Sequence, residues 1–564
     1  MGDGPRQTWR FGCSDRQRAL LLLVLGSTAI LLLALRLRLP NLGGRPLGFD
    51  EAFHSEVALG APDFAGLRRA VATQFQPLLD HVLRRYVCAP LLGSQELGIR
   101  LPAMLASLLA ILASVGLAAW GFARNERPMW EAVLAGMAIG IWHAGYAHDI
   151  GASGVARHYA LTGCLSILWT GLFVFGEPER AWKRFALCGL LFANTHFFSL
   201  SLLGTGYAFL AIGHLVHARR QAALREIAVF AAIVSLTAVV NWPALSALLS
   251  NPVEPRHLGA GVVLQAFGET WLLAKRFAAF LALPILPAVL WLLLVLAGGL
   301  VRELPRVLVA KVSSLALLAT PGLFFLGSLR SGHHIEERYF MPFVGLAPLL
   351  LALGALLVVR LLERALAATK RVSASRVGQA VVLPLVVSMV VGGAKLAARP
   401  GGFDVPGLPS RRAAIVDALK REARPVFLLS SPCWTDAVVR FYWRFVGTVA
   451  PKYPLQTADQ RGYEGCVLGG FPPGSLAEEN LRLFLERAPD GLVVFYQHHL
   501  PCFRQRFVPP ARLATDGTNA SCLTILLDAI SVERTRATAD AVGYPAGIQT
   551  LLERRQSQYD HLHL

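Results

Sequence analysis

A pair of neighbouring carboxylates, Asp50 and Glu51, follows the first long apolar run of the chain. That run covers about residues 18–39, so the pair is expected at the mouth of a membrane-spanning helix. Ionised groups at a bilayer edge are costly and typical of functional sites, and a carboxylate there can act as a general base in group transfer. If a helix begins here, His54 lies on the same face as Asp50. The alternative is an ordinary solvated loop start.

Three further clusters of polar residues are expected on the same side of the membrane. They contain Gln76; Asp149, Arg157 and Tyr159; and His333, His334, Glu336, Arg338 and Tyr339. Guanidinium groups hold phosphates through charge-assisted hydrogen bonds, so Arg157 and Arg338 are candidate phosphate contacts. The alternative for each arginine is a side chain that snorkels to the interface. A carboxylate base beside such arginines is suited to transfer from a lipid phosphate donor.

A metal site is the second interpretation of the histidine cluster. His333, His334 and Glu336 carry imidazole and carboxylate groups, which suit zinc or manganese. The ligand spacing of a closed structural zinc site is missing, which favours a solvated loop. A divalent metal cofactor therefore stays open, and the same holds for Asp50, Glu51 and His54.

Composition indicates the class of protein that must position these residues. The chain has 564 residues, of which 54% are hydrophobic and 16% charged, with a mean hydropathy of +0.49. This is too apolar for a soluble enzyme of that length, so the sequence predicts a polytopic α-helical membrane protein with about eleven spans. The predicted spans are 18–39, 99–122, 131–147, 159–176, 185–198, 201–217, 227–248, 277–301, 311–329, 340–360 and 380–398.

Basic residues predict the orientation of these spans. Arg6, Arg10, Arg16 and Arg18 precede the first span, and every second loop afterwards is rich in Arg and Lys. Since such residues stay on the cytoplasmic side, we expect a cytoplasmic N-terminus in a multi-pass protein. The Ala-, Leu- and Arg-rich composition, and the lack of a retention signal in His561-Leu562-His563-Leu564, favour the plasma (inner) membrane. The net charge of +18 then reflects topology, because the basic residues are dispersed over loops. A nucleic-acid partner is not expected.

The loops divide the chain into two expected domains. Residues 1–398 form a transmembrane module, within which 40–98 is a first extracytoplasmic loop with amphipathic stretches at 52–60 and 64–88. Residues 399–564 alternate short β-rich runs (425–430, 491–497, 522–528) with helical patterns (410–422, 434–447, 475–488), which predicts an extracytoplasmic soluble α/β domain. Its role is open between acceptor recognition and structural packing.

Four cysteines, Cys433, Cys466, Cys502 and Cys522, lie in this last domain. An extracytoplasmic location permits disulfides, with three connectivities for four cysteines, whereas the alternative is four reduced, buried thiols.

Taken together, several segments resemble the GT-C membrane glycosyltransferases, in the branch of the protein O-mannosyltransferases and the ArnT-like aminoarabinose transferases. The resemblance covers about residues 15–400. It rests on Phe49-Asp50-Glu51, Gln76-Pro77-Leu78, Leu97-Gly98-Ile99-Arg100-Leu101-Pro102, Ala156-Arg157-His158-Tyr159-Ala160-Leu161 and Arg338-Tyr339-Phe340-Met341-Pro342. Gln76-Pro77 departs from a His-Pro-Pro-like element of that branch.

The resemblance implies a sugar donor linked to a polyprenyl phosphate and an inverting transfer. It makes Asp50 the base, Glu51 its neighbour, Arg157 and Arg338 phosphate contacts, and Asp149 a second carboxylate. The expected partners are the lipid-linked donor, membrane lipid, and an acceptor that is a protein, a lipid or a polysaccharide. Direct attack by an activated nucleophile needs one base and stabilisation of the departing phosphate, which agrees with a carboxylate base and two arginine contacts.

Two other classes compete with a transferase. A lipid or sugar transporter or flippase also places ionisable groups at depth, but the sequence has no inverted repeat and its charges gather on one face. A non-catalytic scaffold with a partner-binding tail domain is the third class, and the acidic pair Asp50-Glu51 argues against it.

Overall fold

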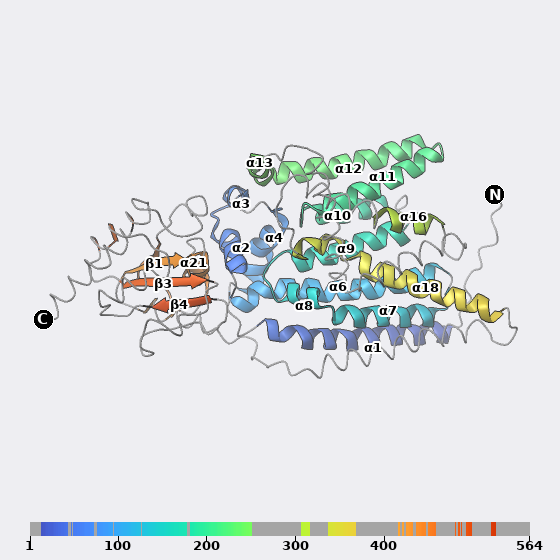
Figure 1. Ribbon diagram of the computed structural model, residues 1–564, viewed down its shortest axis with the longest axis horizontal. Coiled ribbons are helices and arrows are strands. Elements are labelled where there is room, and N and C mark those ends of the chain that lie inside the picture. The colour runs from blue at the N-terminus through green and yellow to red at the C-terminus, as the bar shows by residue number, and fades with distance from the viewer. Residues whose placement is uncertain are drawn as a thin grey trace, which may run out of the picture. The chain divides into compact units, whose positions relative to one another are not determined.

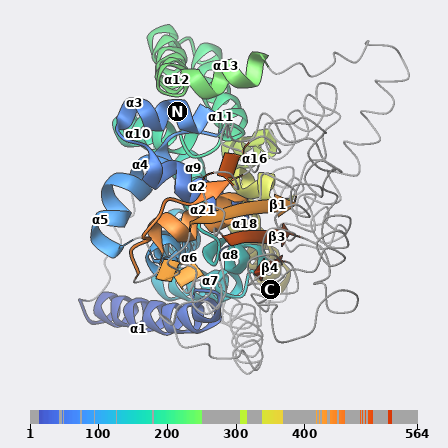
Figure 2. The same cartoon turned by 90° about the vertical axis from the view of Figure 1, so that its left-hand side faces the viewer.

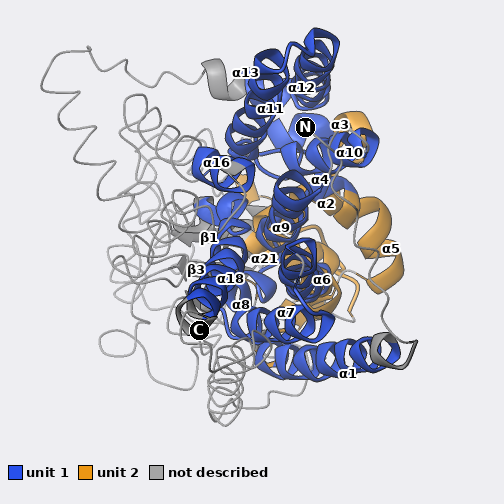
Figure 3. Ribbon diagram, turned by 90° about the vertical axis from the view of Figure 1, so that its right-hand side faces the viewer, with its two compact units in different colours: residues 1–39, 68–82, 102–402 blue, residues 40–67, 83–101, 403–564 orange. Residues whose placement is uncertain are grey.

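The computed structural model describes residues 13–42, 49–72, 76–93, 95–125, 127–176, 181–250, 306–315, 337–367, 425–431, 436–446, 449–457, 492–498 and 521–525, with isolated positions such as Leu47. These residues belong to two compact units, coloured separately in Figure 3. Unit 1 comprises 1–39, 68–82 and 102–402, and unit 2 comprises 40–67, 83–101 and 403–564.

Unit 1 is a bundle of helices (Figure 1). Its helices are α1 (Cys13–Arg38), most of α6 (Glu96–Arg124), α7 (Met129–Ala144), α8 (Ala147–Ser153), α9 (Tyr159–Phe175), α10 (Trp182–Ala193), α11 (Ser199–Val216), α12 (Arg220–Val240), α13 (Trp242–Ser250), α16 (Arg306–Ser314), the 3-10 segment η4 (Glu337–Phe343) and α18 (Leu346–Ala367). Most of the short helix α4 (Leu79–Leu83) and the end of α3 (Phe64–Ala72) also belong to unit 1.

Five helical segments of the described residues are long and apolar enough to cross a membrane. They are Gln17–Arg38, Glu96–Arg124, Ser199–Val216, Arg220–Val240 and Phe340–Leu361. These confirm four of the predicted spans and the first part of a fifth, 227–248, and together with the composition they identify an integral membrane protein. The predicted spans 277–301 and 380–398 lie outside the described residues, as does most of 311–329.

Two predicted stretches are wrong as single helices. The predicted span 227–248 is divided, because α12 ends at Val240 and α13 begins at Trp242, one residue before Pro243. Proline has no N–H to donate to the preceding turn, so it suits a helix start and interrupts a continuing helix. The amphipathic stretch 64–88 is likewise not one helix, since residues 76–78, which include Pro77, are not helical and lie between α3 and the helix that begins at Leu79.

Aromatic side chains fill the core of unit 1. Trp169 of α9 is fully buried and stacks on Phe173 and Phe185, with ring centroids 5.4 and 5.3 Å apart. The start of α18 packs closely against α9, since a side chain on Gly345 would approach the Ser166 carbonyl oxygen to 2.7 Å. The segment that contains α18 is therefore the most buried of the five membrane-crossing candidates among the described residues, with 89% of its apolar window buried, against 17% for α1.

Unit 2 combines short helices with a sheet. Its first part holds α2 (Phe49–Gly60), the π-helical segment η2 (Arg84–Cys88), α5 (Ala89–Leu92) and the first residues of α6. Its last part holds α21 (Asp436–Phe445) and a four-stranded sheet of order β2-β1-β3-β4, from β1 (Val426–Ser431), β2 (Gln456–Thr457), β3 (Leu492–His498) and β4 (Ser521–Ile525).

The sheet confirms the predicted α/β character of the C-terminal domain. Strand β1 pairs in parallel with β2 and β3, whereas β3 pairs antiparallel with β4, and Figure 2 shows β1, β3 and β4 side by side. The predicted runs 425–430, 491–497 and 522–528 correspond to β1, β3 and β4, and α21 lies within the predicted helix 434–447.

Candidate functional site

The acidic pair lies in the first turn of α2, as the sequence predicts. Asp50 occupies the second residue of this helix, and its side chain is outside the described part of the structure. Glu51 is buried, and both of its oxygens accept from the Arg100 guanidinium, at 2.9 Å from Nε and 3.0 Å from NH2. Arg100 is fully buried as well, so the two side chains form a bidentate ion pair shielded from solvent.

His54 is buried one turn further along α2, with its ring next to that of Phe53. The neighbouring hydroxyl of Ser55 accepts from Arg84 NH1 at 3.3 Å. Arg84 belongs to the π-helical segment η2, a geometry that often occurs at functional sites. Carboxylate, imidazole and guanidinium groups therefore gather around the inner face of α2 in unit 2.

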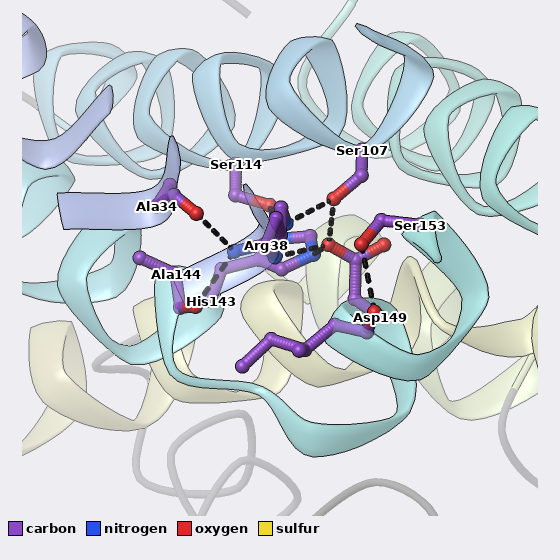
Figure 4. A network of polar contacts seen from close by, with 9 residues as sticks. Ala34, Arg38, Ser107, Ser114, His143, Ala144, Asp149 and Ser153 are labelled. Carbon is purple, nitrogen blue, oxygen red and sulfur yellow. Dashed lines mark hydrogen bonds and ion pairs between the residues drawn. The ribbon is translucent and has the colours of Figure 1, made fainter. Parts of the chain in front are cut away.

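A second polar network surrounds Asp149 in unit 1 (Figure 4). Asp149 lies in α8, just after α7 ends, and its Oδ2 accepts from Arg38 NH2 at 2.7 Å and from Ser107 Oγ at 2.5 Å. Arg38, the last residue of α1, also donates to Ser107 Oγ and to the carbonyl oxygen of Ala144. One guanidinium thus joins the ends of α1 and α7 to α6 and α8.

His143 extends this network along α7. Its Nδ1 lies 2.7 Å from Ser114 Oγ, and its Nε2 lies 3.5 Å from Asp149 Oδ2. Burial by itself would raise the pKa of Asp149, but His143, Arg38 and Ser107 together lower the pKa of Asp149 to about 2. Asp149 is therefore ionised and compensated at neutral pH, which suits a structural tie better than proton transfer.

The candidate phosphate contact Arg157 is buried between α8 and α9. Its guanidinium lies over the ring of Tyr159, 5.0 Å from the centroid. His158 and His196 lie beside it, with their ring centroids 5.4 Å apart, in the turns that begin α9 and join α10 to α11. Burial and then the charge of Arg157 lower the pKa of His196 to about 3, so His196 is neutral at physiological pH.

Gln76 lies in unit 1, beside a hydrogen-bonded segment. Two residues on, Leu78 N–H donates to Asn241 Oδ1 at 2.7 Å, and Asn241 Nδ2 donates to Asn194 Oδ1 at 2.8 Å. Gln76 Oε1 is buried and has no hydrogen-bond partner among the described residues. Its segment is thus fixed on the ends of α10 and α12.

The other residues predicted for the site, and the four C-terminal cysteines, have side chains outside the described part of the structure. Arg338 and Tyr339 lie in η4, whose first side chains are outside the described part, and His333, His334 and Glu336 precede it, also outside. Cys433, Cys466 and Cys502 lie outside the described residues too, and of Cys522 only the backbone, in β4, is described. Within the described ranges no group of three His, Cys, Asp or Glu residues could hold a metal ion.

Sequence reasoning missed the cationic partners of both carboxylates. Arg38 ends an apolar run, where it is easily taken for a topology signal, and Arg100 begins a predicted span. One signal could have found these partners: an arginine at the end of an apolar helix is buried only with a carboxylate partner, and Glu51 and Asp149 were candidate carboxylates expected on the same side of the membrane.

Comparison with solved structures finds several chains whose structures are similar to this one. The chain is similar to ArnT from Cupriavidus metallidurans bound to undecaprenyl phosphate, with 14% identity, a TM-score of 0.48, and coverage of 90% of this chain and 97% of that one. The apo state of the same protein is similar too, with 14% identity, a TM-score of 0.49, and coverage of 90% of this chain and 98% of that one. The Archaeoglobus fulgidus oligosaccharyltransferase tethered with an acceptor peptide shows 13% identity and a TM-score of 0.47, with coverage of 86% of this chain and 69% of that one. No family model and no curated protein sequence matches the chain.

Proposed function

We propose that this protein is an integral-membrane glycosyltransferase that moves a sugar from a polyprenyl-phosphate donor to an extracytoplasmic acceptor. The observation that carries the proposal is the acidic pair at the start of α2, in which Glu51 is neutralised by Arg100 at 2.9 and 3.0 Å. Glu51 thus positions the helix, and Asp50 is the carboxylate left to act as base.

The proposed chemistry is an inverting displacement. Asp50 takes the proton from the acceptor nucleophile, which forms a bond to the anomeric carbon of the sugar. The bond between that carbon and the donor phosphate breaks, and the lipid phosphate leaves with the electron pair. Cationic side chains stabilise the phosphate as its charge grows. Arg157, with Tyr159 beneath its guanidinium, is the described residue suited to this contact.

The donor class follows from the resemblance of the acidic pair and the Arg157 segment to the GT-C enzymes, and from the composition of a membrane protein. The proposed location is the plasma membrane, with the N-terminus in the cytoplasm and the site on the opposite side. A divalent metal would be held at the undescribed histidine cluster or at Asp50, and no step above requires it. The acceptor class is left to experiment.

The test is transfer by purified protein in proteoliposomes, with a panel of radiolabelled polyprenyl-phosphate monosaccharides. Replacing a general base reduces turnover by about 10²- to 10⁴-fold, and Asp50→Asn should do so while donor binding is retained. The matched control is Asp63→Asn, at an exposed residue whose Oδ1 accepts from Gly66 N–H and whose capping role asparagine can fill.

Two outcomes would overturn the proposal. Transfer by Asp50→Asn at the wild-type rate removes Asp50 from the role of base. Movement of labelled lipid across the bilayer by wild-type protein, without sugar transfer from any donor of the panel, identifies a transporter instead.

A further inference from the structure

The C-terminal helix α21 contacts the acidic helix α2 within unit 2. Tyr442, in the second half of α21, is fully buried. Its hydroxyl accepts from Leu47 N–H at 2.8 Å and donates to the carboxylate of Glu96. One hydroxyl of the C-terminal domain therefore contacts both the backbone that leads into α2 and the first residue of α6.

The contact with Glu96 connects Tyr442 to the acidic pair. Glu96 and Arg100 are four residues apart on α6, on the same face of the helix. Arg100 in turn holds both oxygens of Glu51. Tyr442 thus fixes the helix end that carries the guanidinium, while it also fixes the chain three residues before Asp50.

A second contact holds α2 further along. Glu56 accepts from Arg440 Nε, at 3.1 Å to Oε1 and 3.3 Å to Oε2, and its Oε1 lies 3.8 Å from Arg444 NH1. Helix α21 therefore contacts the segment before the acidic pair and the helix after it. Polar contacts on both sides of a short segment restrict its translation and its rotation.

We propose that Tyr442 is a positioning residue for the acidic pair, and that α21 of the C-terminal domain holds α2 in the orientation that transfer requires. This inference rests on the proposed function, because it assigns Asp50 as the group being positioned. A role in packing alone does not account for the buried hydroxyl: a phenylalanine would fill the same volume without contacting Leu47 and Glu96. The buried carboxylate of Glu96 also needs such a donor, since an unsatisfied buried charge is costly.

The experiment compares Tyr442→Phe with wild-type protein by two measurements. Hydrogen–deuterium exchange with mass spectrometry reports the amide of Leu47, which loses its acceptor in the variant. Initial rates with the polyprenyl-phosphate monosaccharide panel report kcat and the KM for the donor. We expect faster exchange over residues 47–56 and a kcat lowered about tenfold, the size of one buried hydrogen bond, with KM within about twofold.

A matched control is Tyr207→Phe. Tyr207 of α11 is buried in the core of unit 1, and its hydroxyl has no hydrogen-bond partner among the described residues. This variant removes the same atom from a buried ring, so exchange in α2 and kcat should both stay at wild-type values.

A charge exchange tests the second contact. Arg440→Glu alone places two carboxylates together and should lower kcat, whereas Glu56→Arg combined with Arg440→Glu restores the pair and should restore kcat at least threefold over the single variant. A protein that is merely misfolded by Arg440→Glu would not recover in this way.

The outcomes separate the two proposals. Faster exchange with lowered kcat and unchanged KM supports the inference. Faster exchange with unchanged kcat overturns the positioning role, and unchanged exchange overturns the contact itself. Absence of transfer by the wild-type protein overturns the proposed function. This result is distinct from the others, because it is seen before any Tyr442 variant is compared.

Discussion

The substitution Asp149→Asn tests the buried network that joins α1, α6, α7 and α8. Arg38 is fully buried and donates to Asp149 at 2.7 Å, so the substitution leaves a buried guanidinium without its counter-ion. Removing one partner of a buried ion pair costs about 3–5 kcal/mol. Ser107→Ala should cost less, about 1 kcal/mol, because it removes hydrogen bonds and retains the ion pair.

The double substitution Arg38→Met with Asp149→Leu provides the second comparison. Replacing a buried pair by apolar side chains of similar volume is often neutral, so the double variant should lie within about 1 kcal/mol of wild type. Measured beside its two constituent single variants, Arg38→Met and Asp149→Leu, the double variant gives the coupling energy of the pair. Asp63→Asn, at an exposed position, is the control and should change stability by less than about 0.5 kcal/mol.

The assay is equilibrium unfolding of the purified protein by SDS in mixed detergent micelles, followed by tryptophan fluorescence. A loss of less than about 1 kcal/mol for Asp149→Asn would show that the native protein does not depend on this pair. A double variant as unstable as Asp149→Asn would show that the loss arises from packing volume and not from an uncompensated charge.

Other substitutions and conditions give expected outcomes of their own. The pKa of Asp149 is lowered from 3.8 to about 2 in the folded state, so its contribution to stability is complete above about pH 5 and is lost as the pH falls through 4 towards 2. Unfolding at pH 7, 4 and 3 will show this loss. Gly345→Ala should destabilise by about 1–3 kcal/mol because its methyl group meets backbone atoms of α9, whereas Gly151→Ala, with open space around it, should be neutral or stabilising by up to about 1 kcal/mol in the same assay. Asn241→Leu removes the acceptor of the buried Leu78 N–H, so the Leu78 amide should exchange faster and stability should fall by about 1–3 kcal/mol; an unchanged exchange rate would contradict this contact.

The sequence predicted the helices well where hydrophobic runs were long. Apolar runs at 18–39, 99–122 and 340–360 correspond to helices in the structure, because a run of about twenty apolar residues has few other stable conformations. The strands β1 and β3 were also predicted, since short β-branched runs between turn residues favour strands. The helix break before Pro243 was missed, because the apolar run continues through this position while the helix does not.

The site was predictable in residue type and not in pairing. Asp50 and Glu51 were found as an acidic pair, but the sequence does not show that Glu51 lies against Arg100, since 48 residues separate them. The same applies to Tyr442 and Glu96, which belong to expected domains at opposite ends of the chain. Such pairs depend on tertiary packing, which a single sequence does not specify through periodicity or spacing.

The unequal burial of the spans has a consequence for the choice of membrane. Since 89% of the α18 window is enclosed by protein but 17% of α1 and 22% of α12, lipid tails contact mainly the outer helices. The apolar segment of α1, 22 residues in length, spans about 33 Å and therefore matches an average hydrocarbon layer. In a thinner bilayer α1 must tilt or be compressed against its neighbours, while the enclosed helix α18 keeps its surroundings. Because Arg38 connects the end of α1 to Asp149, a tilt of α1 caused by hydrophobic mismatch strains this network. Bilayer thickness should therefore be held constant in reconstitution.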